Sequence, residues 1–201
     1  MSINRATRQH YRRHVRSLVG LLKRERPRPK LGMEIGCFSG EMADALLRYL
    51  PSLNLVLCDP YSPVPEGCPY HDKAQSELWG QPEWDEIFVK ARQRLRKYAG
   101  RVLWRLCTDT EMDWIDGIDG KLDFVFLDAL HDESSVRRGL EVCYPRLRSG
   151  GIFAGHDYHA RFEAIGDPGW GVKKAVDAFV SLQGLPPVEV LHGRVFWLRK
   201  P

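Results

Sequence analysis

Residues 31–40 read Leu-Gly-Met-Glu-Ile-Gly-Cys-Phe-Ser-Gly, and they form the most informative stretch of the chain. The first half, Leu31–Ile35, is a short apolar run typical of a buried strand. Gly36 and Gly40 follow, and a helix-like segment runs from Glu41 to Tyr49. Glycines at a strand–helix turn let a ligand approach the backbone, whose amides can face anionic groups. The Gly-x-x-x-Gly spacing disfavours a nicotinamide dinucleotide, although alone it fits a plain strand–helix turn equally well.

The pattern of short apolar runs and helix-like segments continues along the chain. Further strands are expected at 53–58, 102–107, 122–127 and 152–155, and helices at 134–147 and 172–182. Strands that alternate with helices predict an α/β fold, with a mostly parallel sheet covered by helices on both faces. The last two strands, Val188–Leu191 and Arg194–Arg199, are joined by His192-Gly193, which predicts a tight hairpin and one antiparallel strand. The proline-rich stretch from Pro60 to Pro82 is expected to cover the carboxyl edge of the sheet.

Composition narrows the class of protein. The chain has 201 residues, 43% hydrophobic and 28% charged, which suits one soluble domain with a real core. No stretch approaches the ~20 apolar residues of a membrane span, and we expect no secretory signal at the N-terminus. The five cysteines lack a Cys-x-x-Cys pair, which disfavours a disulfide scaffold and a zinc ribbon, and we expect a cytoplasmic location.

The basic residues are concentrated at the N-terminus. Residues 1–30 carry ten Lys/Arg and one acid, whereas residues 31–201 carry twenty Lys/Arg and twenty-five acids. We therefore divide the chain into a basic amphipathic arm, 1–30, and a main domain, 31–201. A basic helix over Arg5–Arg26 could contact nucleic acid, an acidic membrane surface or an anionic substrate, or mediate a homodimer. We favour a packed helix with a solvated charged face.

Acidic and histidine side chains follow several of the predicted strands. Asp59 ends the second strand, where an acid of a nucleotide-binding fold accepts hydrogen bonds from ribose hydroxyls, although an Asp-Pro turn is the plain alternative. Asp109-Thr110 follows the third strand and could contact an adenine or form a capping box.

Two more predicted strands are followed by both carboxylate and imidazole side chains, which are Asp128, His131, His156 and Asp157. If these strands are neighbours, Asp128, His156 and Asp157 could share one divalent ion, such as Mg²⁺ or, with a histidine ligand, Mn²⁺, Fe²⁺ or Zn²⁺. His131 lies one turn beyond Asp128, where an imidazole could take a proton from a hydroxyl.

Taken together, these motifs resemble class I S-adenosylmethionine-dependent methyltransferases, in particular the catechol-type and antibiotic-sugar O-methyltransferases. The resemblance covers about residues 31–199 and includes Glu34-Ile-Gly-x-x-x-Gly40, Asp128-x-x-His131, Ser149-Gly-Gly151, Gly155-His-Asp-Tyr158 and Gly171–Phe179. It implies a Rossmann-like sheet of seven strands in the order 3-2-1-4-5-7-6.

The resemblance also implies roles for individual residues. Those expected to bind the cofactor are Glu34, Gly36, Phe38, Ser39, Gly40, Asp59, Asp109, Thr110 and Asp128. Asp128, His156 and Asp157 match the metal-binding positions, and His131 falls where catechol-type relatives carry the lysine base. Relatives carry Asp-Asp or Asp-Asn at 156–157, so His156 could instead face the substrate as a catalytic group. Leu130 stands where sugar-modifying relatives have an aspartate.

We therefore expect transfer of a methyl group to a hydroxyl of a small molecule or glycoside. A divalent metal could assist this transfer. An RNA-directed methyltransferase that uses the basic arm is the main alternative. The acidic main domain and the lack of an aromatic–basic stripe weigh against nucleic acid without excluding it. A non-catalytic subunit that retains the fold is a third reading.

Overall fold

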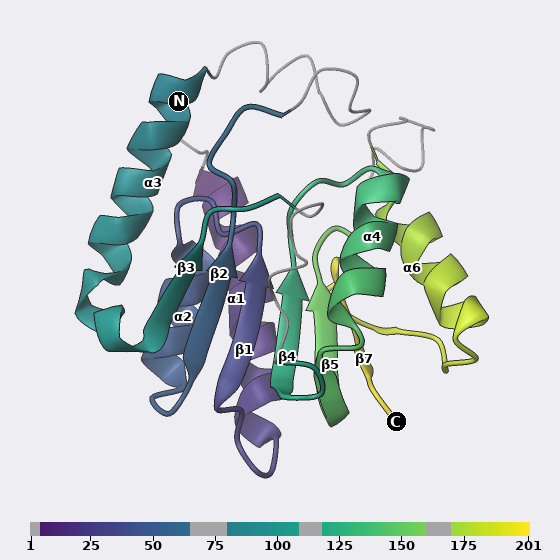
Figure 1. Ribbon diagram of the computed structural model, residues 1–201. Helices are drawn as coiled ribbons and strands as arrows, with labels where there is room; N and C mark the ends of the chain where they lie inside the picture. Colours follow the sequence, from purple (N-terminus) through teal and green to yellow (C-terminus); the bar gives the residue numbers. More distant parts are fainter. Residues whose placement is uncertain (1–4, 65–79, 109–117, 160–169) are drawn as a thin grey trace.

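A seven-stranded sheet forms the centre of the computed structural model, which describes residues 5–64, 80–108, 118–159 and 170–201 (Figure 1). The strand order is β3-β2-β1-β4-β5-β7-β6, as predicted. Strands β1 to β5 pair in parallel, and β7 pairs antiparallel with both β5 and β6. The strands are β1 (Leu31–Ile35), β2 (Asn54–Cys58), β3 (Val102–Arg105), β4 (Leu122–Leu127), β5 (Leu147–Gly155), β6 (Glu189–Leu191) and β7 (Val195–Arg199).

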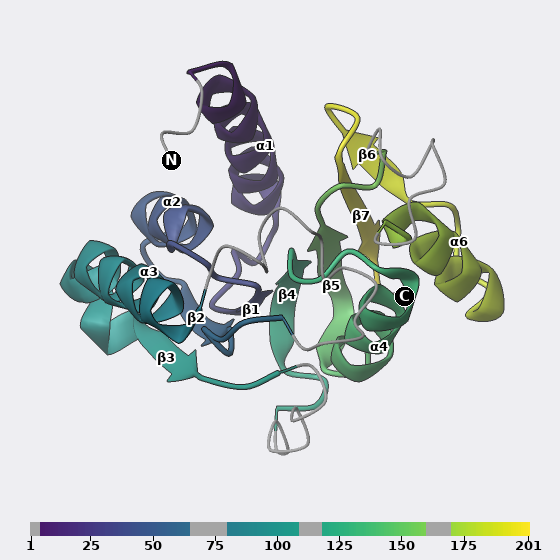
Figure 2. The same ribbon diagram turned by 90° about the horizontal axis from the view of Figure 1, so that it is seen from above.

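Helices cover both faces of the sheet, which confirms the α/β prediction (Figures 1 and 2). The helices α1, α2 and α3 lie on one face, and α4 and α6 lie on the other. Their bounds are α1 (Arg5–Arg24), α2 (Glu41–Tyr49), α3 (Gln81–Leu95), α4 (Glu133–Cys143) and α6 (Val172–Leu182), with a 3₁₀ turn η1 at Arg96–Arg101. The sheet side chains alternate between two separate cores, one under each helical layer.

The basic N-terminal helix packs against the sheet. Leu18 and Leu22, one turn apart, are fully buried in the core formed with α2. Just beyond the helix, Glu25 accepts two hydrogen bonds from the Arg199 guanidinium of β7, at 2.7 and 2.9 Å. The predicted amphipathic helix is therefore part of the packed layer. Among the described residues, no helix combines the length and apolar character of a membrane span.

Some boundaries differ from the predictions for local reasons. The sequence analysis missed α3, whose buried stripe is short: Ile87, Ala91 and Leu95, spaced four residues apart. Strand β5 begins at Leu147, five residues earlier than predicted, and its register against β4 shifts between Leu122 and Phe124, where Gly150 takes φ +74°. Of the predicted proline-rich cover, residues 65–79 lie outside the described part of the chain.

The C-terminal hairpin forms at the predicted residues, but its loop is one residue longer than predicted and includes Arg194. His192 has φ 50° and Gly193 has φ 75°, so both occupy the left-handed region that suits a tight connection. Strands β6 and β7 then pair from Leu191 opposite Val195. The hairpin brings Arg194 to the carboxyl edge of the parallel strands, where the predicted site residues lie.

Candidate active site

The turn between β1 and α2 requires glycine at its first position. Gly36 has φ +82°, and a Cβ added there would lie 2.0 Å from the carbonyl oxygen of Asp128. Its N–H donates to the carbonyl of Cys58 at 2.9 Å. Gly40, with φ +73°, directly precedes α2. The predicted cofactor turn therefore touches the carboxyl end of β4.

Glu34 is a buried carboxyl group beside this turn. It is 2% exposed, and its Oε2 has no hydrogen-bond partner within the described residues. Burial raises its pKa well above the ordinary value, and the charges of Asp128 and Asp59 raise it further. A cationic ligand that donates a hydrogen bond would pair with Oε2 and stabilise the ionised form of Glu34. S-adenosylmethionine carries two such positive groups, a sulfonium and an ammonium. The residues around Glu34 thus fit that cofactor.

Asp59 ties the end of β2 to the same turn. Its Oδ2 accepts from the backbone N–H of Phe38 at 2.8 Å, and its Oδ1 accepts from that of Tyr61 at 2.9 Å. Burial raises the pKa of Asp59, whereas these backbone hydrogen bonds lower it. Each carboxylate oxygen keeps a second lone pair, so Asp59 can still accept from ribose hydroxyls.

The other predicted cofactor residues differ in their surroundings. Phe38 has φ 46° and is 39% exposed, and its ring meets Trp84 edge to face, with centroids 6.1 Å apart. Ser39 faces α3, where its carbonyl and hydroxyl oxygens accept from Arg94. The predicted contacts of Asp109 and Thr110 lie outside the described residues.

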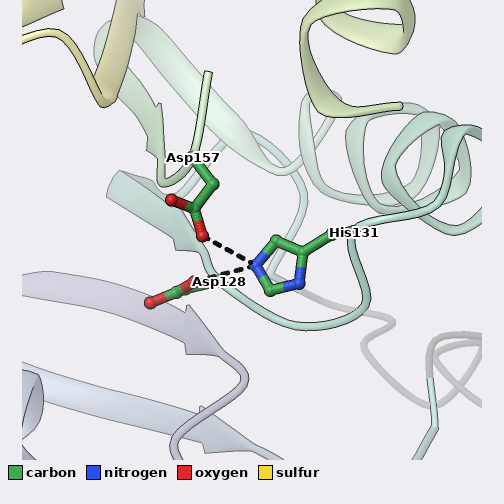
Figure 3. Close-up of side chains that lie close together, drawn as sticks. All are labelled: Asp128, His131 and Asp157. Carbon is green, nitrogen blue, oxygen red and sulfur yellow. Dashed lines mark ion pairs between the residues drawn. The ribbon is translucent and has the colours of Figure 1, made fainter. Parts of the chain in front are cut away.

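Four predicted side chains come together at the ends of β4 and β5. His131 Nε2 lies 3.5 Å from Asp128 Oδ1 and 3.3 Å from Asp157 Oδ2 (Figure 3). His156 Nδ1 lies 3.3 Å from Asp157 Oδ2 and 3.8 Å from Asp128 Oδ1. Two carboxylates therefore lie between two imidazoles, which come from different loops.

This arrangement fits a divalent cation. One donor atom each from Asp128, His131 and Asp157 lies within 4.8 Å of the others. Two carboxylates and an imidazole suit Mn²⁺, Fe²⁺ or Zn²⁺ better than Mg²⁺, which prefers oxygen ligands only. The sequence analysis gave His156 as the third metal ligand. In the structure, His131 also lies close enough to the two carboxylates to serve as the third ligand.

The electrostatics of the cluster couple its acids to its histidines. Burial lowers the pKa of His131, but hydrogen bonds and charges from Asp128 and Asp157 outweigh it and raise the pKa to about 9. The same carboxylates outweigh burial at His156 and raise its pKa. Burial raises the pKa of Asp157, but the two histidines more than reverse this and hold it well below the ordinary value. Without a bound cation, His131 therefore carries a proton near pH 7 and must lose it before acting as a base.

Neighbouring groups hold the cluster in place. Asp157 has φ 58°, and its Oδ1 accepts from Arg194 Nη1 at 2.7 Å, which leaves Oδ2 facing the histidines. The ring of His131 stacks on Trp170, with ring centroids 4.5 Å apart and planes 24° apart. The carbonyl of His131 accepts from Gly171 N–H at 2.7 Å, at the start of α6.

The sequence analysis missed Arg194, which holds Asp157, and it also missed His14 of α1. His14 is 1% exposed, and its Nδ1 lies 2.8 Å from His156 Nε2. Its position held a usable signal: His14 precedes Leu18 by one helical turn, so it lies on the apolar face of an otherwise basic helix. Nothing in the local sequence shows that this face meets His156.

Comparisons with known proteins identify the family and the fold. A family model described as a methyltransferase domain matches residues 33–158. No curated protein matches the sequence. Solved structures share the fold at low identity. A candidate caffeoyl-CoA O-methyltransferase from Staphylococcus aureus has a TM-score of 0.67 and 14% identity, with coverage of 100% of this chain and 86% of that one.

Two further structures show how widely this fold is used. The O-methyltransferase TomG from Streptomyces achromogenes, solved with S-adenosylmethionine, has a TM-score of 0.61 and 18% identity and covers 94% and 79% of the two chains. Spermidine synthase from Thermotoga maritima has a TM-score of 0.59 and 16% identity, and covers 94% and 59%. Such similarities establish the fold, whereas the family match spans more than half of the chain. The protein therefore belongs to the methyltransferase domain family and is a class I S-adenosylmethionine-dependent methyltransferase.

Proposed function

We propose that this methyltransferase transfers the methyl group of S-adenosylmethionine to a hydroxyl oxygen of a small-molecule or glycoside acceptor. The observation that carries the proposal is the Asp128–His131–His156–Asp157 cluster, which adjoins the turn at Gly36. A hydroxyl needs a group to orient it and to take its proton, and this cluster offers both. The O-methyltransferase names of two structural neighbours agree with this choice.

The reaction is an in-line displacement at the methyl carbon. The bond from that carbon to sulfur breaks as the bond to the acceptor oxygen forms, and the sulfide leaves as a neutral group. The leaving group therefore needs no acid, and the protein's main tasks are alignment and proton removal. We assign cofactor binding to Glu34, Gly36, Phe38, Ser39, Gly40, Asp59 and Asp128, with Asp109 and Thr110 at the adenine.

The acceptor proton goes to an imidazole of the cluster. We assign this role to His131, with His156 as the second candidate, because both rings contact the two carboxylates. Asp128 and Asp157 would hold a divalent cation together with whichever of His131 and His156 does not take the proton. Such a cation, when bound, would orient the hydroxyl and lower its pKa. In its absence, the carboxylates stabilise the positive charge that the imidazole gains.

A transfer assay with methyl-labelled cofactor tests the proposal on a panel of phenols, catechols and glycosides. We expect His131→Ala to lower kcat by about 10²–10⁴-fold while the Kd for S-adenosylmethionine stays unchanged. His192→Asn is the matched control, since His192 is exposed in the hairpin and asparagine tolerates its positive φ. Undiminished turnover by His131→Ala would remove His131 from the mechanism.

The metal and the acceptor class need separate arms of that assay. We expect a chelator to abolish turnover and Mn²⁺ to restore it, whereas full activity of the chelated enzyme would refute metal assistance. Labelled methyl on RNA, with none on small hydroxyls, would favour the RNA-directed alternative.

A further inference from the structure

His14 connects the N-terminal helix to the methyl-transfer site. Its side chain is 1% exposed, and its Nδ1 lies 2.8 Å from Nε2 of His156, with ring centroids 4.9 Å apart. Helix α1 precedes residue 33, where the family match begins, so this contact reaches the site from outside the matched region. Within the proposed mechanism above, His14 has no role.

The packing of α1 fixes the position of His14. Leu18 and Leu22, one and two turns further along, are fully buried, and the ion pair between Glu25 and Arg199 anchors the end of the helix to β7. Figure 2 shows α1 standing between α2 and the β6–β7 hairpin. The ring of His14 is therefore held by several turns of packed helix rather than by one loop.

Hydrogen-bond directions show what His14 does to His156. The Nδ1 of His156 lies 3.3 Å from Asp157 Oδ2, and because a carboxylate only accepts, this nitrogen carries hydrogen in the chain without a bound cation. In a neutral His156, Nε2 then accepts and His14 donates from Nδ1. In a protonated His156 both nitrogens donate, and His14 accepts. In either state, the contact keeps Nδ1 of His156 directed at the carboxylates.

We propose that His14 is a positioning residue of the methyl-transfer site, which holds the ring of His156 with Nδ1 toward Asp157 and Asp128. The inference rests on the proposed function only for its effect on turnover. The orientation of His156 is a property of the folded chain, and it can be measured without an acceptor or a metal.

The first experiment measures the tautomer of His156 by ¹⁵N NMR of the full chain labelled at histidine, at a pH where this ring is neutral. His156→Asn identifies the signal. We expect the Nδ1–H form in the wild type, and a shift toward the Nε2–H form in His14→Leu. We expect His14→Asn to keep the wild-type signal, because the side-chain amide nitrogen of asparagine lies as far from the backbone as Nδ1 of histidine. Arg13→Ala, exposed on the same helix, is the matched control.

An unchanged His156 signal in His14→Leu would overturn the proposal, as would a His14→Asn signal that follows His14→Leu. These outcomes do not depend on finding an acceptor, so they are distinct from failure of the proposed function.

The second experiment uses turnover on whichever acceptor the transfer assay identifies. We expect His14→Leu to lower kcat about tenfold with an unchanged KM for S-adenosylmethionine, and His14→Asn to restore it. In a His156→Asn background the same change should have almost no further effect, because the two residues act through one contact. Additive losses in the double variant would overturn the positioning role.

Discussion

Replacing Gly36 by alanine should disrupt the fold and the cofactor site together. The residue has φ +82°, and the new Cβ would lie 2.0 Å from the carbonyl oxygen and 2.5 Å from the carbonyl carbon of Asp128. The left-handed backbone alone costs an alanine about 1–2 kcal/mol. Relief of the overlap requires a backbone shift, which adds about 1–3 kcal/mol. The total, roughly 2–5 kcal/mol, corresponds to a fall in Tm of about 5–20 °C for a domain of this size.

Thermal unfolding followed by circular dichroism measures this loss, and calorimetry with S-adenosylmethionine measures the accompanying loss of affinity. Gly120→Ala is the matched control, because Gly120 has φ +66° but no atom of the described residues lies within 4 Å of the Cβ that alanine would add. It should show the left-handed cost alone and keep full cofactor affinity. Equal changes in Tm for the two variants would refute the reasoning, since they would show that contact with Asp128 adds nothing.

Three other changes probe separate features. Leu22→Ala should lower the free energy of unfolding by about 2–5 kcal/mol in urea titration, because Leu22 is fully buried in the core shared with α2, and a loss below about 1 kcal/mol would contradict that packing. Burial raises the pKa of Asp123, but hydrogen bonds from Leu31 N–H and Arg148 outweigh it and hold the pKa below its ordinary value. Its stabilisation is therefore complete above about pH 5, declines through the unfolded-state pKa of about 4 and is lost as pH falls through the folded-state pKa, so Asp123→Asn should reduce stability at pH 7 and flatten its acid dependence. Asp59→Asn should weaken S-adenosylmethionine binding about 10–100-fold in calorimetry, and unchanged affinity would remove Asp59 from the cofactor site.

The sheet could be predicted because its signals are local. Strands β1 and β4 are buried along almost their whole length, so they appear in the sequence as mainly apolar runs, interrupted by Glu34 and Asp123, that end at glycine or aspartate. The resemblance to a known family then supplied the strand order. Helix α3 was missed because its three buried side chains leave a narrow stripe on a helix rich in charge.

The candidate site could be predicted only in part. Residues that directly follow strands, such as Asp59, Asp128 and Asp157, are identifiable because parallel strands end at the same edge of a sheet. His14 comes from a helix far away in the sequence, and only tertiary packing brings it to His156. The stacking of Trp170 on His131 is equally nonlocal, since it depends on where the chain re-enters the fold before α6.

Backbone hydrogen bonds across the carboxyl edge of the sheet explain why binding and turnover should separate in some variants but not in others. The N–H groups of Asp59, Gly36, Asp128 and His156 each donate to the neighbouring strand, at 3.1, 2.9, 2.8 and 3.0 Å. These bonds join the ends of β3, β2, β1, β4 and β5 in one row, so the backbone fixes the positions of the residues that directly follow these strands. Side-chain changes at Asp59 or His131 leave the row intact and can affect one task at a time. A change at Gly36 displaces the row itself, and it must therefore impair cofactor binding and the carboxylate cluster together.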